Sequence, residues 1–304
     1  MKYGHNERRL KRGLAIGVAL LILCTPSLSL GWGAGGHMMT ASIAYSRLNP
    51  RAKAKARELL AIPINPASVS RKSKNFINAA HWADDLRPFE EFDSFKPLHF
   101  INKPFSDDGT PLPTNLPEDN IVKALEDNVS ILRTSTDKNA QALALRLIIH
   151  FVGDIHQPLH CATRFSEALP DGDRGGNLFS IRIRGNDGKL KKSNLHSYWD
   201  SGIGTFPPTG PNFTPPPLSR IPAAVALAVV NNPDTDPDLN LDDPFSFSAW
   251  ADESHALALD FGYKGAKVGR KPNAAYNRKA VRVARKRVAW GGYRLAALLN
   301  EIWP

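Results

Sequence analysis

The sequence predicts a mainly α-helical protein, built as a single compact multi-helix domain with a small β-hairpin. Apolar residues recur at helical spacing along most of the chain, whereas only one pair of short alternating segments flanks a turn. No internal repeat with a period of about 20–50 residues is visible. Hydrophobic residues make up 42% of the 304 residues, which excludes a disordered or collagen-like chain. Two cysteines are too few for a disulfide scaffold or a cysteine-rich zinc module.

The start of the chain is typical of a secretion signal. A basic stretch precedes the apolar run Gly13–Leu23, and the small and polar stretch Thr25–Gly31 follows it. The apolar run is about half the length needed to cross a bilayer. Lipidation at Cys24 is the alternative, but the residue before it is not small. We therefore expect residues 1–31 to be a cleaved signal peptide and the mature protein to start at Trp32.

Cleavage there leaves residues 32–304 as one domain of 273 residues, near the upper limit for a single hydrophobic core. It removes five basic residues and one acidic residue, so the formal net charge falls from +10 to +6. Cys161 is then the only cysteine, which excludes an intramolecular disulfide. We expect a secreted or periplasmic monomer with no membrane anchor.

Eight segments have the periodicity of helices. They are His37–Leu48, Pro50–Leu60, Ser73–Leu86, Asn120–Arg133, Lys138–Asp154, Asn194–Ser201, Ser248–Phe261 and Asn273–Ile302. The last helix is expected to break near Gly291 and Gly292, because glycine is a poor helix former.

Two other features complete the predicted architecture. Asn177–Arg184 and Lys189–Ser193 flank an Asn-Asp-Gly turn and predict the hairpin. The segment 201–247 contains ten prolines, so we expect mostly irregular structure around one short helix at Ala223–Val230. A domain boundary in this segment is the alternative. The helical segment that follows fits the same core, which favours one domain.

Histidine and aspartate gather in five short segments. They are Trp32–His37, His81–Arg87, Pro97–Asn102, His150–His160 and His196–Asp200. Each segment alone has a structural explanation, such as a capping pair on a helix surface or a hydrogen-bonded histidine in the core. All five together in one chain favour a functional site.

Two of these segments place a histidine and an aspartate four residues apart. His150 and Asp154 are neighbours on one helix face, and His196 and Asp200 repeat the spacing. A proline ends the first of these helices, so that His160 can approach from another direction. Imidazole and carboxylate suit Zn²⁺, and burying them is costly unless they are paired or bound to metal. The pattern predicts a zinc site inside a helical bundle.

The five segments, in order from Trp32 to Asp200, resemble the zinc-dependent single-strand-specific nucleases and 3′-nucleotidases, which share a fold with bacterial zinc phospholipases C. The patterns Trp-Gly-x-x-Gly-His and His-x3-Asp-x5-His carry most of the resemblance. Weaker similarity follows in Asp173–Asn177, Trp250–Ser254 and Tyr293–Asn300. The resemblance covers nearly the whole mature chain and implies a phospholipase C/nuclease-like fold.

The resemblance implies three zinc ions. For the first ion it implies the ligands Asp84, His99, His150 and Asp154. For the second it implies His160, His196 and Asp200. For the third it implies His37, the α-amino nitrogen and carbonyl oxygen of Trp32, and Asp154 as a bridge to the first. An amine that is still part of a peptide bond cannot donate its lone pair, so a complete site is expected to need signal cleavage.

Three Zn²⁺ ions carry more positive charge than the three aspartates among their ligands neutralise, so the cluster is positively charged. Such a cluster favours a phosphodiester as substrate, because the negative charge on the phosphate oxygens grows during the reaction. We expect a hydroxide that bridges the Asp154-linked zinc pair to attack phosphorus in line. The remaining zinc would neutralise the leaving 3′-oxygen, which yields 5′-phosphate products. The expected substrates are single-stranded RNA and DNA and 3′-nucleotides.

Four further residues match family positions near the substrate. Arg87 matches a phosphate-clamping cation, with a surface salt bridge as the alternative. Asn177 matches an asparagine near the scissile phosphate, with a turn residue as the alternative. Phe100 matches an aromatic that stacks on a nucleobase, although without the resemblance it would be assigned to the core. Asn102 stands where many relatives have Asp, so base preference and general-base assistance do not carry over.

Four residues lie outside the implied ligand pattern. We expect Cys161 to pack as a small buried residue, with zinc contact as the alternative. His81 is expected on the far side of its helix, and His156 is expected to orient a ligand carboxylate or the local backbone. His255 is expected to pack or to face solvent.

The segment from Lys264 to Arg294 contains eleven basic residues and no acidic residue. These residues form either the solvated face of an amphipathic helix or a track for nucleic acid phosphates.

Two other functions compete with a nuclease. A zinc phospholipase C on the same fold is disfavoured by the short gap between Trp32 and His37, and by Asp200, where those enzymes usually have Glu. A non-catalytic envelope protein that binds zinc or nucleic acid is disfavoured by the residues placed near the substrate, which storage would not require.

Overall fold

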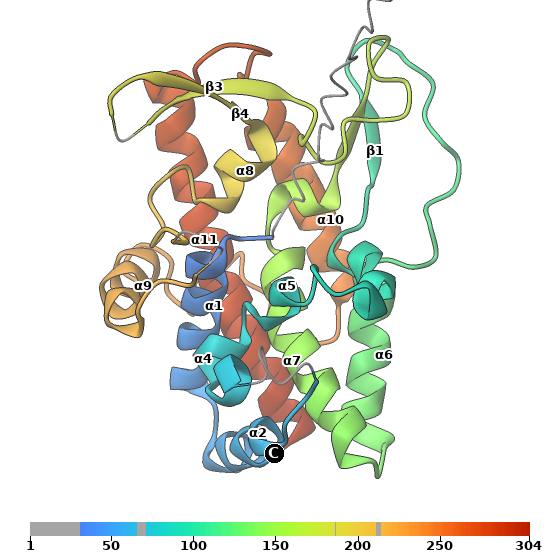
Figure 1. Ribbon diagram of the computed structural model, residues 1–304, viewed down its shortest axis with the longest axis vertical. Coiled ribbons are helices and arrows are strands. Elements are labelled where there is room, and N and C mark those ends of the chain that lie inside the picture. Colours follow the sequence, from blue (N-terminus) through green and yellow to red (C-terminus); the bar gives the residue numbers. More distant parts are fainter. Residues whose placement is uncertain (1–30, 66–70, 186, 211–213) are drawn as a thin grey trace, which may run out of the picture.

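Two long helices run through the centre of the fold, α7 (Lys138–Ile155) and α11 (Ala274–Ile302). They pack against each other and against α1 (Ala34–Arg47), which lies along α11 (Figure 1). The computed structural model describes residues 31–304 apart from 66–70, 186 and 211–213. The expected signal peptide, apart from Gly31, lies outside the described residues.

Shorter helices and two small sheets surround this centre. The remaining α-helices are α2 (Pro50–Ala61), α4 (Phe76–Ala79), α5 (Trp82–Asp85), α6 (Ile121–Thr134), α8 (Leu195–Asp200), α9 (Ile221–Val229) and α10 (Phe247–Leu257). The 3₁₀ turns are η1 (Arg71–Lys74), η2 (Glu90–His99), η3 (Pro158–Cys161) and η5 (Leu218–Arg220), and the π-helical turn η6 (Ala258–Tyr263) continues α10. Strand β1 (Pro104–Ser106) pairs in parallel with β2 (Thr163–Phe165), and β3 (Ser180–Arg184) pairs antiparallel with β4 (Leu190–Asn194). The predicted mainly helical class is confirmed.

Side-chain caps explain where several helices begin. An Asn or Asp oxygen accepts a hydrogen bond from the first turn of six of the described α-helices, and the capping residues are Asn49, Asn75, Asn120, Asp137, Asn194 and Asn273. Such a cap satisfies backbone N–H groups that have no partner within the helix. Two of these caps start α7 and α8, which carry candidate site residues.

Two clusters of buried apolar side chains form the core. One surrounds α2, α6 and α7 and includes Ile148 and Phe151, and the other surrounds α8 and α11 and includes Trp32 and Trp199. Helix α1 contributes buried side chains to both clusters. Every residue of α7 from 144 to 155 is buried. A polar group on this part of α7 must therefore find its partners inside the protein.

One predicted helix is wrong, because Ser73–Leu86 does not form a continuous helix but divides into η1, α4 and α5. Asn75 Oδ1 accepts hydrogen bonds from the backbone N of Ile77 at 2.9 Å and of Asn78 at 3.4 Å. This side-chain cap competes with helix continuation and starts a new helix at that point.

The expected break in the last helix is also wrong, because α11 continues through Gly291 and Gly292 to Ile302. A Cβ atom on Gly292 would lie 2.6 Å from Cβ of Ile43 and 2.9 Å from the carbonyl oxygen of Thr40. Both of these residues belong to α1. The glycine therefore permits the close approach of α1 and α11 rather than ending the helix.

The hairpin prediction is confirmed by β3 and β4, which place Arg182 opposite Lys192. Residue 186 of its turn lies outside the described residues. In the described part of the segment 201–247, regular structure is confined to the short helices η5 and α9 and the start of α10, as expected from the prolines. Across the described residues, no helix combines the length and the hydropathy required to span a bilayer.

We predict that Gly292→Ala destabilises the protein. The added methyl group would overlap α1, and overpacking of this kind costs about 1–3 kcal/mol. Urea unfolding measures the loss. Gly291→Ala is the matched control, since a Cβ there would meet its nearest atom, Cγ of His156, at 3.3 Å. Equal stability of the two variants would contradict the close contact at Gly292.

Candidate metal centre

The predicted histidines and aspartates converge on three adjoining groups. In each group the potential ligand atoms lie within 4.8 Å of one another. The groups are His37, His150 and Asp154; Asp84, His99 and His150; and His160, His196 and Asp200. Seven of these eight residues are buried, and the Asp84 side chain is 8% exposed. Eight of the nine predicted ligand residues therefore meet through their side chains in one place.

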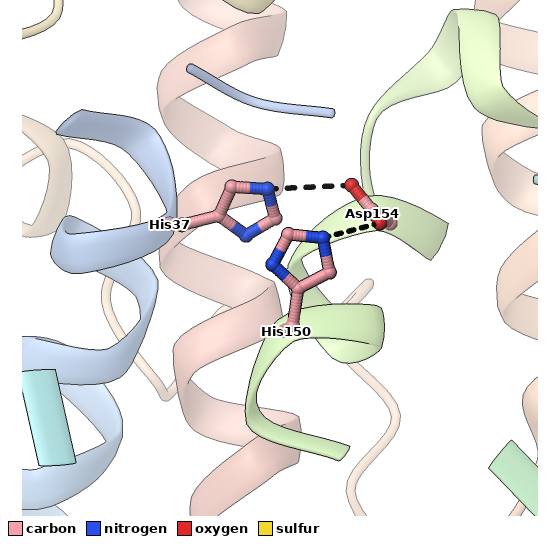
Figure 2. A group of neighbouring side chains, drawn as sticks. All are labelled: His37, His150 and Asp154. Carbon is pink, nitrogen blue, oxygen red and sulfur yellow. Dashed lines mark ion pairs between the residues drawn. The ribbon is translucent and has the colours of Figure 1, made fainter. Parts of the chain in front are cut away.

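Asp154 connects the first two groups. Its Oδ1 lies 3.3 Å from Nε2 of His37, and its Oδ2 lies 2.9 Å from Nε2 of His150 (Figure 2). The same Oδ2 lies 2.9 Å from Nδ1 of His99. Oδ1 also lies 3.6 Å from Nδ1 of His160, which belongs to the third group. The two oxygens of one carboxylate thus face different imidazoles, as a carboxylate that bridges two cations requires.

Asp84 supplies a second carboxylate to the cluster. Its Oδ1 lies 3.7 Å from Nε2 of His150 and 3.8 Å from Nδ1 of His99. Nη2 of Arg87 lies 2.9 Å from the same oxygen, and the Arg87 side chain is 11% exposed. The guanidinium group therefore forms a largely buried salt bridge with one of the candidate ligands.

Backbone carbonyls orient three of the imidazoles. The pairs, each with 2.6 Å between Nδ1 and the carbonyl oxygen, are His150 with Ala80, His160 with His99, and His196 with Gly175. A carbonyl only accepts, so Nδ1 carries the proton in the neutral imidazole and Nε2 keeps its lone pair. Contacts of this kind fix the ring that binds a metal.

A loop with unusual backbone angles supplies one of these carbonyls. Arg174, Gly175 and Gly176 have φ values of 56°, 63° and 82°. Oδ1 of Asp173 accepts a hydrogen bond from the backbone N of Gly176 at 3.0 Å and holds the loop in this shape. The loop therefore positions the carbonyl that orients His196.

Several buried ligand atoms make no hydrogen bond in the described part of the chain, although Oδ1 of Asp84 lies at ion-pair distance from Arg87 and Oδ1 of Asp154 from His37. They are Nε2 of His37, His160 and His196, and Oδ1 of Asp84 and Asp154. A buried polar atom without a partner costs about 1–3 kcal/mol, so this concentration is unexpected unless the atoms bind a ligand. Imidazole nitrogen and carboxylate oxygen form a donor set typical of zinc. The residues present fit bound zinc ions.

Burial and mutual charge set the protonation of the first two groups. Burial lowers the pKa of His99 to about 4, and the nearby Arg87 adds to the effect. Burial opposes a charge on His150 too, but the carboxylates of Asp154 and Asp84 outweigh it and raise the pKa of His150 to about 9. Burial opposes a charge on Asp154, but the attraction of His150 and His160 together with hydrogen bonds from His150 and His37 outweighs it, so the pKa of Asp154 falls well below its usual range. Without bound metal, this part of the cluster therefore holds an ionised Asp154 and a protonated His150.

The remaining imidazoles are neutral at neutral pH. Burial lowers the pKa of His37 to about 4 and that of His196 well below its usual value. Burial also lowers the pKa of His160. In contrast, burial raises the pKa of Asp200 well above its usual value. The imidazoles can accept a cation directly, whereas the Asp200 carboxyl must lose a proton wherever the pH lies below its raised pKa.

Trp32, the ninth predicted ligand, is buried next to the first group. A Cβ atom on Gly31 would overlap Oδ1 of Asp154 and would lie 2.9 Å from Nε2 of His37. The backbone that leads into Trp32 therefore borders these two side chains. The indole ring packs on Phe206, with 5.4 Å between the ring centroids.

The predicted substrate residues lie on segments that also carry candidate ligands or their anchors. Asn177 ends the loop that orients His196, and its Nδ2 donates to the carbonyl oxygen of Arg174 at 2.8 Å. Oδ1 of Asn177 is buried and has no hydrogen-bond partner among the described residues. Phe100 and Asn102 are half-buried and follow η2, which ends at a candidate ligand.

Cys161, His81 and His255 belong to none of the three candidate groups. Cys161 is buried and belongs to none of the three groups, and burial raises the pKa of its thiol to about 12. Nδ1 of His81 lies 3.2 Å from Oδ2 of Asp85. Nδ1 of the half-buried His255 lies 3.0 Å from the carbonyl oxygen of Cys161.

Sequence analysis missed a charge network that supports the end of α7. Nδ1 of His156 lies 2.8 Å from the carbonyl oxygen of Val152, and its Nε2 accepts from Nη1 of Arg294 at 3.1 Å. Glu253 pairs with Arg294 at 2.6 Å and with Arg287 at 2.7 Å. Both arginines are buried. The expected local role of His156 is confirmed, whereas these two arginines, counted with the basic C-terminal residues, are structural.

Sequence analysis also missed the role of Gln157. Its Nε2 donates to Oδ1 of Asp200 at 2.7 Å, and its Oε1 accepts from the backbone N of Leu159 at 2.6 Å. The residue is fully buried and holds the Asp200 carboxyl in place. Its position in the turn between two predicted ligands was the only feature in the sequence that could have indicated this role.

The helical fold thus carries three adjoining His/Asp groups that could hold metal ions. The model of the S1/P1 Nuclease family matches residues 32–304, and the chain belongs to this family. The similar protein Endonuclease 4 of Arabidopsis thaliana is 26% identical over 291 residues, which cover 90% of each chain. Nuclease P1 of Penicillium citrinum is 25% identical over 89% of this chain and 97% of its own. Nuclease S1 of Aspergillus oryzae is 28% identical over 63% of this chain and 60% of its own.

We predict that zinc binding at the third group releases a proton and strengthens as the pH rises. Below the raised pKa of Asp200 the carboxyl is protonated, so affinity should increase about tenfold per pH unit until it ionises. Competition with a chromophoric chelator between pH 5 and 8 measures this slope. In Asp200→Asn the slope should fall by about one proton. An unchanged slope in that variant would contradict the assignment.

Proposed function

We propose that this protein is an exported zinc-dependent endonuclease that cleaves single-stranded RNA and DNA to 5′-phosphate products and also hydrolyses 3′-nucleotides. The observation that carries the proposal is the meeting of three buried His/Asp groups at Asp154 in a member of the S1/P1 nuclease family. Members of this family are zinc-dependent nucleases that act on single strands. The relatives described above are named as nucleases, which favours this function over a phospholipase C.

The contacts support three zinc ions. In this proposal one ion is held by Asp84, His99, His150 and Asp154. Another is held by His160, His196 and Asp200. The third is held by His37, Asp154 and the backbone of Trp32. Bound zinc supplies Lewis acidity and positive charge for phosphate ester hydrolysis.

Asp154 and Arg87 have separate roles in the proposed reaction. Asp154 stays ionised and keeps its two oxygens aimed at different groups of imidazoles, which holds the reacting centre together. Arg87 binds a phosphate oxygen, because its planar guanidinium matches the geometry of phosphate. Its contact with Asp84 holds this guanidinium at the edge of the cluster.

Three residues are proposed to position the nucleic acid. Asn177 lies near the scissile phosphate, on the loop that also orients a ligand. Phe100 stacks on a nucleobase, which contributes about 1–3 kcal/mol and tolerates every base. Asn102 contacts the same nucleotide through a neutral side chain. Unpaired bases can splay onto a ring of this kind whereas stacked duplex bases cannot, which supports a preference for single strands.

Processing at Trp32 is part of the proposal. The family match begins at Trp32, which supports a signal peptide over residues 1–31 and a catalytic domain over residues 32–304. The backbone of Gly31 borders Asp154 and His37. Cleavage at this point would free an amine beside the third zinc site and remove the residue that crowds it. We propose a monomer that is secreted or periplasmic.

We expect the processed protein to hydrolyse heat-denatured DNA, RNA and a 3′-nucleotide, and to act poorly on duplex DNA. A chelator should abolish turnover, and added Zn²⁺ should restore it, because the ligands remain in place. Release of acid-soluble nucleotides, together with zinc counting by atomic emission, measures both effects. Hydrolysis of phosphatidylcholine instead would identify a phospholipase C. Bound zinc without turnover of any phosphate ester would identify a storage protein.

We also expect the free amine of Trp32 to be necessary for a full complement of zinc. Protein that retains Gly31 should bind two zinc ions per chain instead of three and lose at least about 100-fold in activity, since removal of key electrostatic groups has effects of this order. The control is the same chain released by a protease so that it begins at Trp32. Equal zinc content in the two preparations would contradict the role of the amine.

A further inference from the structure

The positive charge of this protein is concentrated in two segments, residues 180–193 and 264–282. Together they contain twelve Lys and Arg and one Asp. The rest of the chain contains 27 Lys and Arg against 28 Asp and Glu, so it is close to neutral. The formal net charge of +10 is therefore a property of these two segments.

The two segments form one continuous surface. The backbone N of Gly269 donates to the carbonyl oxygen of Ser180 at 2.7 Å, and that of Arg182 donates to the carbonyl oxygen of Arg270 at 3.1 Å. The segment before α11 thus lies alongside β3. Figure 1 shows the β3–β4 hairpin at the end of the molecule where α11 begins. We call the exposed basic side chains of residues 180–193 and 264–282 the hairpin–helix surface.

These basic side chains contribute little to the fold. Arg182 and Lys192 stand directly opposite each other on β3 and β4, and both are exposed. Like charges at directly paired positions destabilise a sheet. Arg278, Lys279 and Arg282 are exposed on α11, whereas the buried arginines later in this helix pair with Glu253. The buried cations therefore have acidic partners, whereas on the hairpin–helix surface only Lys191 and Lys264 pair with a carboxylate among the described residues, that of Asp187 and of Asp260.

A hollow of about 360 Å³ lies within this surface. Its lining includes Lys264 and Lys279, the side chains of Phe261, Asn273 and Tyr276, and one acidic residue, Asp260, whose carboxylate lies 4.0 Å from Nζ of Lys264. A volume of this size is typical of a small-molecule site. Two ammonium groups next to an aromatic ring are groups that a nucleotide phosphate and its base can contact.

The hairpin–helix surface adjoins the metal centre. Strand β4 ends at Asn194, whose side chain caps α8, and α8 carries His196 and Asp200. The hydroxyl of Tyr198 on α8 donates to Oδ1 of Asn277 on α11 at 3.2 Å. A nucleic acid strand that leaves the metal centre past α8 would therefore reach the basic side chains within a few nucleotides.

We propose that the hairpin–helix surface binds the phosphates of a single-stranded polynucleotide beyond the nucleotide that is cleaved. The inference rests on the proposed function, since it supposes that the cleaved strand continues past the metal centre. Each neutralised phosphate of a single strand contributes about 0.7 to the slope of log affinity against log salt. The surface therefore increases the affinity for long substrates and adds nothing to the turnover of a mononucleotide.

The test compares two triple variants of the processed enzyme. Arg182→Gln, Lys192→Gln and Lys279→Gln together neutralise the hairpin–helix surface. Arg51→Gln, Lys53→Gln and Arg57→Gln make the same charge change on α2, at the other end of the molecule in Figure 1. The substrates are a 30-nucleotide single strand without secondary structure and a 3′-mononucleotide, each over a range of salt concentrations.

We expect the surface variant to raise KM for the 30-mer about tenfold at low salt and to flatten its salt slope by about two, the value for three lost phosphate contacts. Its kcat/KM for the mononucleotide should stay within about twofold of wild type, and the α2 variant should resemble wild type with both substrates. Equal effects of the two variants on the 30-mer would overturn the proposal, because net charge alone would then explain them. A loss of binding to anionic lipid vesicles without a loss for the 30-mer would also overturn it.

Binding of the 30-mer, measured by fluorescence anisotropy, separates this proposal from the proposed function. If wild-type protein binds the 30-mer through the hairpin–helix surface but cleaves no phosphate ester, the proposed binding surface is supported and the proposed nuclease function is rejected. If wild-type protein cleaves both substrates and the two variants have identical KM, the proposed nuclease function is supported and the proposed binding surface is rejected.

Discussion

The ionised carboxylate of Asp154, enclosed in the protein interior, is the constraint around which the site is arranged. Helix α7 is buried along most of its length because it fills the core, and it carries His150 and Asp154 inward. A buried charge is costly unless cations or hydrogen-bond donors surround it. Imidazoles from α1, η2 and η3 surround this carboxylate, with 2.9 to 3.6 Å between their ring nitrogens and the carboxylate oxygens. Zinc ions would compensate the buried charge more completely, because they would also bind the ligand atoms that make no hydrogen bond among the described residues.

Irregular segments, rather than the long helices, aim the ligands. A continuous helix over 73–86 would have used the carbonyl oxygen of Ala80 as an internal acceptor. Because the helix is interrupted, this oxygen contacts Nδ1 of His150 instead. The end of η2 and the positive-φ loop at Gly175 offer carbonyls to His160 and His196 in the same way. The departures from regular helix thus serve the metal centre.

Cations occupy two different environments in this chain. Arg287 and Arg294 are buried against Glu253 and support the end of α7, where loss of their partner would leave uncompensated charge. Basic residues of the hairpin and of the first turns of α11 are exposed and add little to folding. We therefore assign stability and substrate attraction to separate cations, although helix α11 carries some of each kind.

Amino-acid pattern alone specified the features that depend on local spacing. The apolar periodicity predicted α7, and the four-residue spacing placed His150 and Asp154 on one face before any contact was known. The same spacing predicted α8 with His196 and Asp200, and the five-segment motif indicated which residues meet. Helix continuity was harder to predict, because the cap at Asn75 and the contact of Gly292 with α1 depend on competing partners. Only the tertiary structure decided which carbonyl orients each imidazole, that Gln157 holds Asp200, and that two arginines of a basic helix turn inward to Glu253. These contacts join residues far apart in the sequence, and the burial that gives them their strength exists only once the chain has packed.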